Sequence, residues 1–308
     1  MSNSNEAYIK IPRSFTMEYS QINSILNQLA RIEDSNVNAI GLDFTVTSFF
    51  SAELSTFLGI IIQYLQGRGY KLFTINLKTD SKVGKILSKN EFLKLIMDRD
   101  PIRDTYNSTI KYVKVNSDNI NSINSYLENN FIPKFESTVR INDLNRELEE
   151  SFKDSIFEFS DNISAHSHSK YLYMCGQYFH NNKELKMAIA DMGITIPRNL
   201  REHQVLLDKV GDEEYINWAM QKGNSTKEIP QSGMGLNEIK EAMKRLGHMT
   251  IVSNRGYWKQ NYDGTIQKKL LSEPFPGTLL HMNILLDKSN YYENDILNIF
   301  ENNDELVF

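Results

Sequence analysis

Residues 188–197 read AIADMGITIP, and this stretch decides the fold expected for the C-terminal half of the chain. An apolar run typical of a buried strand delivers Asp191 into a turn. A buried carboxylate accepts a hydrogen bond from an exocyclic amine such as that of adenine. Gly193 permits close approach of the backbone. The stretch therefore predicts one wall of a nucleotide pocket, although an ordinary turn at a strand end is the alternative.

A second motif lies upstream, at residues 158–167 (EFSDNISAHS). Glu158, Asn162 and His166 are four residues apart, so they share one face of a predicted helix. An apolar stripe along residues 144–163 occupies the adjacent face. An Asn oxygen is a hard ligand for Mg²⁺, and a Glu can orient or deprotonate a nucleophile. The motif favours phosphate chemistry, and a solvated helix face is the alternative.

A third motif, SGMGL at residues 232–236, precedes a predicted amphipathic helix at 236–246. Gly233 and Gly235 at a helix N-terminus offer free N–H groups and the positive end of the helix dipole to phosphates. Alone, the two glycines are equally consistent with a simple turn into a helix.

Taken in order, the three segments resemble the N box, G1 box and G2 box of the GHKL ATPase superfamily, which includes gyrase, heat-shock chaperone ATPases, histidine kinases and mismatch-repair ATPases. Residues 247–256 resemble the strand pair that follows the G2 helix, and residues 275–286 resemble the terminal strand. The resemblance covers about residues 137–287. It implies that the cofactors are ATP and Mg²⁺.

The resemblance also implies a role for each matching residue. Glu158 would be the catalytic carboxylate, Asn162 would ligate Mg²⁺, and Asp191 would bind the adenine amine. Residues 198–231 would form a mobile lid, and Thr195 stands where the family usually has a second glycine. The residues expected to bind the cofactor are Asn162, His166, Asp191, Gly193, Ile196, Gly233, Met234, Gly235, Leu236 and Thr278.

The N-terminal part contains a strand–helix–strand pattern. Residues 38–44 and 70–77 predict strands, and residues 52–66 predict a helix between them with Ser51 as its N-cap. This unit resembles a STAS domain, the fold of anti-sigma-factor antagonists, over about residues 38–97. Those antagonists carry Asp-Ser-Ser-Gly before the helix, and the second Ser is phosphorylated. Here the acceptor position falls on Ala52.

We therefore expect an α+β chain with three parts: a STAS-like regulatory domain plus linker at 1–135, a GHKL (Bergerat) α/β sandwich that binds ATP at 136–290, and an acidic tail at 291–308. Further predicted helices cover 81–97 and 120–129. Further predicted strands cover 110–115, 171–179, 185–190, 248–253 and 277–286.

Composition limits the class of protein. The chain has 308 residues, of which 40% are hydrophobic, and its net charge of -5 argues against a broad nucleic-acid-binding surface. A single cysteine, Cys175, excludes an internal disulfide framework. Residues 1–10 lack the pattern of a signal peptide, and the apolar run 57–62 is far too short to span a membrane. We expect a cytoplasmic protein. His166 and His168 lack the accompanying ligands of a metal site.

The segments before and after the predicted ATP-binding domain exclude some functions of the superfamily. All six histidines lie at His166 or later, which excludes autophosphorylation on an upstream histidine. Only about twenty residues follow Leu286, so the downstream lysine-supplying domain of the gyrase type is not expected. The layout resembles anti-sigma-factor serine kinases. It predicts a Mg·ATP-binding regulatory protein that phosphorylates Ser or Thr of an unidentified partner, or switches partner binding with nucleotide state. By analogy with these kinases we expect a homodimer. A slow ATPase switch and a non-catalytic nucleotide-binding scaffold are the alternatives.

Overall fold

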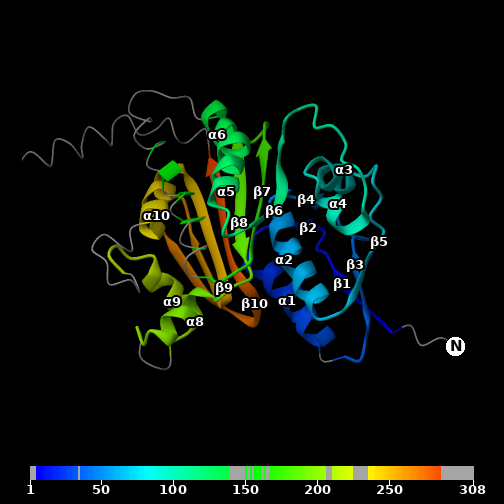
Figure 1. Cartoon of the computed structure of the whole chain (residues 1–308), viewed down its shortest axis with the longest axis horizontal. Helices are drawn as coiled ribbons and strands as arrows, with labels where there is room; N and C mark the ends of the chain where they lie inside the picture. The colour runs from blue at the N-terminus through cyan, green and yellow to red at the C-terminus, as the bar shows by residue number, and fades with distance from the viewer. Residues whose placement is uncertain are drawn as a thin grey trace, which may run out of the picture.

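The computed structural model describes residues 5–33, 35–138, 150, 153–154, 156–157, 159–160, 163, 167–205, 210–224 and 235–285. The chain mixes α and β structure, as the sequence predicts (Figure 1). Within those ranges, no helix has the combination of length and apolar character that crossing a membrane requires.

A five-stranded antiparallel sheet forms the centre of the molecule. Its order is β6-β7-β8-β10-β9. The strands are β6 (Thr109–Asn116), β7 (Tyr171–Phe179), β8 (Glu184–Asp191), β10 (Ile266–Leu285) and β9 (Gly247–Gln260).

Both faces of this sheet are apolar. Successive side chains of a strand point to opposite faces, and in β7 this alternation sends Leu172 and Met174 into one buried cluster and Tyr173 and Cys175 into another. Because each face carries buried apolar residues, each must be covered by other elements.

One face of the central sheet is covered by helices. They are α5 (Ile120–Tyr126), a π-helical turn (Leu127–Phe131) that continues into α6 (Ile132–Thr138), and α10 (Gly235–Leu246). Two short helices, α8 (Ile196–Glu202) and α9 (Asp212–Ala219), pack against β9.

The other face is covered by the N-terminal part of the chain. Helices α1 (Tyr19–Glu33) and α2 (Leu54–Gly67) pack against the central sheet, and beyond them lies a three-stranded parallel sheet of order β1-β3-β5 (Figure 1). The remaining elements of this part are β1 (Glu6–Lys10), β3 (Ala39–Asp43), β5 (Lys71–Ile75), the short parallel pair β2 (Ser14–Phe15) and β4 (Phe49–Phe50), α3 (Lys82–Lys89) and α4 (Phe92–Met97).

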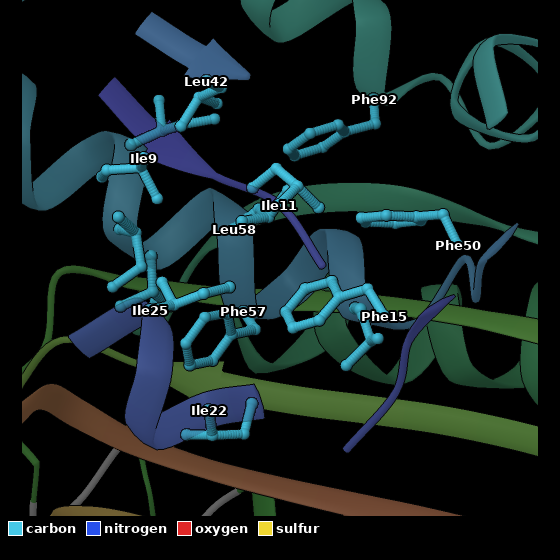
Figure 2. Packing of buried hydrophobic residues seen from close by; sticks show 14 of the residues in the cluster. Ile9, Ile11, Phe15, Ile22, Ile25, Leu42, Phe50, Phe57, Leu58 and Phe92 are labelled. Carbon is cyan, nitrogen blue, oxygen red and sulfur yellow. The ribbon is translucent and has the colours of Figure 1, made fainter. Parts of the chain in front are cut away.

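A continuous core joins the two parts. Figure 2 shows Phe57 and Leu58 of α2 among apolar side chains from β1, β3 and α1. On the side of the central sheet, the Phe57 ring stacks on Phe275 of β10, with centroids 5.3 Å apart. Strand β6, which belongs to the segment 1–135, is hydrogen-bonded to β7. Separate domains at 1–135 and 136–290 stay a prediction, and the two segments share both a sheet and a core.

Several predicted elements are confirmed, and three details were wrong. Strands appear at 39–43, 71–75 and 171–179 as expected. The predicted helix 81–97 is two helices, because Glu91 adopts a left-handed conformation (φ 68°) that interrupts it. Ser51 does not cap α2, since its hydroxyl donates to Glu53 instead. Residues 247–260 form one strand and not the strand pair expected at 247–256.

Replacing Phe57 by Ala tests whether the core is shared. We expect the free energy of unfolding to fall by about 3–5 kcal/mol, because the ring is fully buried between the two parts. Both tryptophans, Trp218 and Trp258, lie on the far side of the shared core, in and beside α9 and β9. Their fluorescence therefore monitors unfolding of the part that contains α9 and β9. If the core is shared, urea unfolding followed by this fluorescence should show the whole loss in free energy of unfolding.

Tyr106→Ala is the control, since this side chain is 75% exposed and its loss should change stability by less than about 0.5 kcal/mol. A tryptophan transition that stays at its original urea concentration in Phe57→Ala would show that the two parts unfold independently.

Candidate functional site

The candidate site is built at the end of strand β8. Asp191 is the last residue of β8, and the sheet register places Thr278 of β10 opposite it. Ser253 of β9 lies opposite Thr278 on the next strand. Three polar side chains from three adjacent strands therefore share one level of the sheet.

The turn after β8 is held to the preceding segment by backbone contacts. Gly193 N donates to Asp191 Oδ1 at 2.6 Å, and Ile194 N donates to the Ser167 carbonyl at 2.6 Å. A Cβ atom added to Gly193 would lie 1.9 Å from that Ser167 carbonyl oxygen. The turn therefore requires glycine at this position for reasons of space.

Asp191 is a buried carboxyl. Its side chain is 1% exposed, and this burial raises its pKa from 3.8 to about 7, although hydrogen bonds from Gly193 N and the Ser167 hydroxyl act in the opposite direction. Burial therefore favours the protonated form of Asp191 more than in an exposed carboxyl. A hydrogen-bond donor brought against the Asp191 side chain would shift its protonation equilibrium towards the carboxylate.

Two buried hydroxyls connect the strands beside Asp191. Ser253 Oγ and Thr278 Oγ1 are hydrogen-bonded at 2.7 Å, and Ser253 Oγ also accepts from Ile196 N at 3.0 Å. Next to them, Gly277 has φ 151°, and a Cβ there would lie 1.9 Å from the Asp191 carbonyl oxygen. The hydrogen bond from Ile196 N to Ser253 Oγ fixes the start of α8 to the sheet.

Thr195 has a structural role at the start of α8. It is the N-cap of α8, and its hydroxyl accepts from Arg198 N at 3.4 Å. Its backbone is extended (φ -73°, ψ 153°), a conformation open to any residue. Threonine is therefore suited to this position, as is usual for a helix N-cap.

The structure brings together four of the residues expected to bind a cofactor: Asp191, Gly193, Ile196 and Thr278. Gly235 begins α10, and Leu236 is half-buried in the first turn of that helix. The other expected residues, Glu158, Asn162, His166, Gly233 and Met234, lie outside the described residues.

Two members of the site, Ser167 and Ser253, were missed from the sequence. Ser167 belongs to the second motif and Ser253 to a predicted strand, but neither pattern shows that their hydroxyls face Asp191 and Thr278. That information depends on the sheet register. Among the described residues, no group of three or more His, Cys, Asp or Glu side chains is arranged to hold a metal ion.

Comparison with known proteins adds no assignment. No family model matches this chain, and no curated protein matches it.

The raised pKa of Asp191 predicts a pH dependence of stability. Between about pH 4 and pH 7 the folded state keeps a proton that the unfolded state has lost, so this carboxyl lowers the free energy of unfolding as the pH rises. The shift from 3.8 to about 7 corresponds to about 4 kcal/mol. Asp191→Asn removes the titration, so its stability relative to wild type should increase across this range in urea unfolding.

Wild type and Asp191→Asn share all other titrating groups, so the difference between their stabilities isolates the titration of Asp191. Parallel stability curves for wild type and Asp191→Asn from pH 4 to pH 8 would contradict the burial argument.

Gly193→Ala should destabilise the fold by about 1–3 kcal/mol, since the added methyl group has no space beside the Ser167 carbonyl. Gly67→Ala is the matched control. A Cβ at Gly67 has no atom within 4 Å, so the change should be neutral or stabilising by up to about 1 kcal/mol. Chemical denaturation of both variants measures the difference, and equal stabilities would refute the steric role of Gly193.

Proposed function

We propose that this chain is a Mg·ATP-binding regulatory protein of the GHKL type with a STAS-like N-terminal module. In this proposal it phosphorylates Ser or Thr of a partner or switches partner binding with nucleotide state. The observation that supports it best is the buried Asp191 carboxyl at the end of a central strand, between a glycine turn and the Thr278 hydroxyl.

The chemistry of this site suits an exocyclic amine. A carboxylate offers about four acceptor positions, and Gly193 N–H and the Ser167 hydroxyl occupy only part of that capacity. A ligand N–H would stabilise the ionised form of Asp191 against the cost of burial.

The phosphate end of the proposed site rests on the sequence motifs. The resemblance gives Asn162 as the magnesium ligand, Glu158 as the catalytic carboxylate, and Gly233 and Gly235 as phosphate-binding positions. Bound Mg²⁺ would supply positive charge against the phosphates. Glu158 would then orient or deprotonate the acceptor hydroxyl or a water molecule.

The N-terminal module is unsuited to be the acceptor of the phosphate. Its loop at Ser51 and Ala52 is 1% and 0% exposed. Ala52 N donates to Gln177 Oε1 of β7 at 2.7 Å, and the Ala52 carbonyl accepts from Asn90 at 3.3 Å. This loop is packed against the central sheet, so it is not accessible as the phosphate acceptor, which agrees with an acceptor on a partner.

Substitutions at the two ends of the proposed site test binding and chemistry separately. Asp191→Asn should weaken ATP binding by about tenfold or more, the value of a hydrogen bond to a charged group. Asp118→Asn, at an exposed residue, should bind ATP like wild type. Glu158→Ala should retain ATP binding and lose turnover. Calorimetry measures binding, and phosphate release or transfer measures turnover.

Each outcome selects one function. Labelled phosphate appearing on a co-purified partner supports the kinase, and free phosphate without transfer supports the ATPase switch. Binding without either supports the scaffold. Absence of any adenine-nucleotide affinity in the wild-type protein would end the proposal.

A further inference from the structure

Ser253 connects the start of α8 to the Thr278 hydroxyl at the candidate site. Ser253 Oγ accepts from Ile196 N at 3.0 Å and lies 2.7 Å from Thr278 Oγ1. The Ser253 side chain is 0% exposed, so water does not compete for either bond. Within the part of the chain that the structure describes, its hydroxyl has no third partner. One buried hydroxyl therefore links the backbone of α8 to the strand beside Asp191.

These contacts favour one direction for the hydrogen bond between the two hydroxyls. A hydroxyl has one proton to donate and two positions at which it can accept. The Ile196 N–H fills one acceptor position of Ser253 Oγ, and among the described residues the Ser253 proton has Thr278 Oγ1 as its only acceptor. Donation by Ser253 pairs this proton and leaves the Thr278 proton available for another acceptor.

Thr278 is placed to bind the same ligand as Asp191. The two residues are directly opposite in the register of β8 and β10. Side chains that are directly opposite in an antiparallel pair lie on the same face, with Cβ atoms about 5 Å apart. Asp191 is 1% exposed and Thr278 is 4% exposed. A buried acceptor beside a buried donor suits a ligand edge that carries an N–H next to a ring nitrogen, as the adenine edge does.

We propose that Ser253 is a positioning residue of the nucleotide site. The Ile196 N–H orients the Ser253 hydroxyl, and Ser253 in turn directs the Thr278 proton towards the base. This inference rests on the function proposed above, since the base is the ligand that Asp191 and Thr278 would bind. Ser253 does not touch the nucleotide, so its loss should affect binding only through Thr278.

Calorimetric titration of the full chain with Mg·ATP tests this role. Ser253→Ala should weaken the affinity by about threefold to tenfold, the range expected for one uncharged hydrogen bond. Ser253→Thr keeps the hydroxyl and should bind ATP within about twofold of wild type, because the same donor remains. Rescue by threonine would show that the hydroxyl, and not the packing of the side chain, is what matters.

A double-mutant cycle shows whether Ser253 acts through Thr278, and it decides the question if the added methyl group of Ser253→Thr prevents folding. Thr278→Val keeps the shape of the side chain and removes its hydroxyl. In this background, Ser253→Ala should weaken ATP binding by less than about twofold, because the hydroxyl that Ser253 directs is already gone. Full additivity of the two losses would overturn the positioning role.

Ser55→Ala is the matched control. Ser55 is also 0% exposed, and its hydroxyl accepts from Asn90 Nδ2 at 2.8 Å in α2, which covers the opposite face of the central sheet. Its loss removes a buried hydrogen bond of the same kind, and it should change ATP affinity by less than about twofold.

Two results would overturn the proposal while the proposed function stands: wild-type affinity in Ser253→Ala, or equal weakening by Ser55→Ala and Ser253→Ala. Wild-type protein without ATP affinity is a different result, because it would end the proposed function and this inference together.

Discussion

Helix α2 imposes the constraint on which the rest of the structure depends. Every residue from 54 to 62 is buried, so this part of the helix must be covered on all sides. The parallel sheet covers one side and the central antiparallel sheet covers the other. Gly59 allows the closest approach, because a Cβ there would lie 2.3 Å from the Tyr112 hydroxyl of β6. Displacing the N-terminal part would expose both α2 and one face of the sheet that carries Asp191.

At the N-terminal end of α2, the contact between the N-terminal part and the central sheet becomes polar. This polar junction fixes how the two parts fit together. Glu53 is 1% exposed, accepts from the Ser51 hydroxyl at 2.6 Å, and lies 3.5 Å from His281 Nε2 of β10. Burial alone would raise the pKa of Glu53, but His281, Lys186 and Ser51 outweigh burial and lower it. His281 is three residues from Thr278 on the same strand, roughly 10 Å along it. The junction and the candidate site therefore share the strands that position both.

The sequence predicted the elements better than their arrangement. Alternation and apolar runs located β7, β8 and α2, because local patterns record whether a residue is buried. They do not record what buries it, so the second covered face of α2 and the extended length of β9 and β10 were not foreseen. The break at Glu91 also escaped prediction, since a positive φ leaves little trace in a helical pattern. Asp191, Gly193 and Thr278 were predicted to lie together and do so in the structure, whereas Ser253 becomes a neighbour only through strand register.

The chemistry of Asp191 is the strongest reason to regard this position as a site and not as a simple turn. The hydrogen bond from Gly193 N needs only a neutral acceptor, which an Asn side chain would supply without a buried charge. A carboxyl in the same place is costly, and its pKa of about 7 reflects that cost. Strongly shifted pKa values cluster at functional sites, which makes Asp191 a candidate site residue. A buried carboxyl after the apolar residues 187–190 therefore carries a cost that the hydrogen bond from Gly193 N does not require.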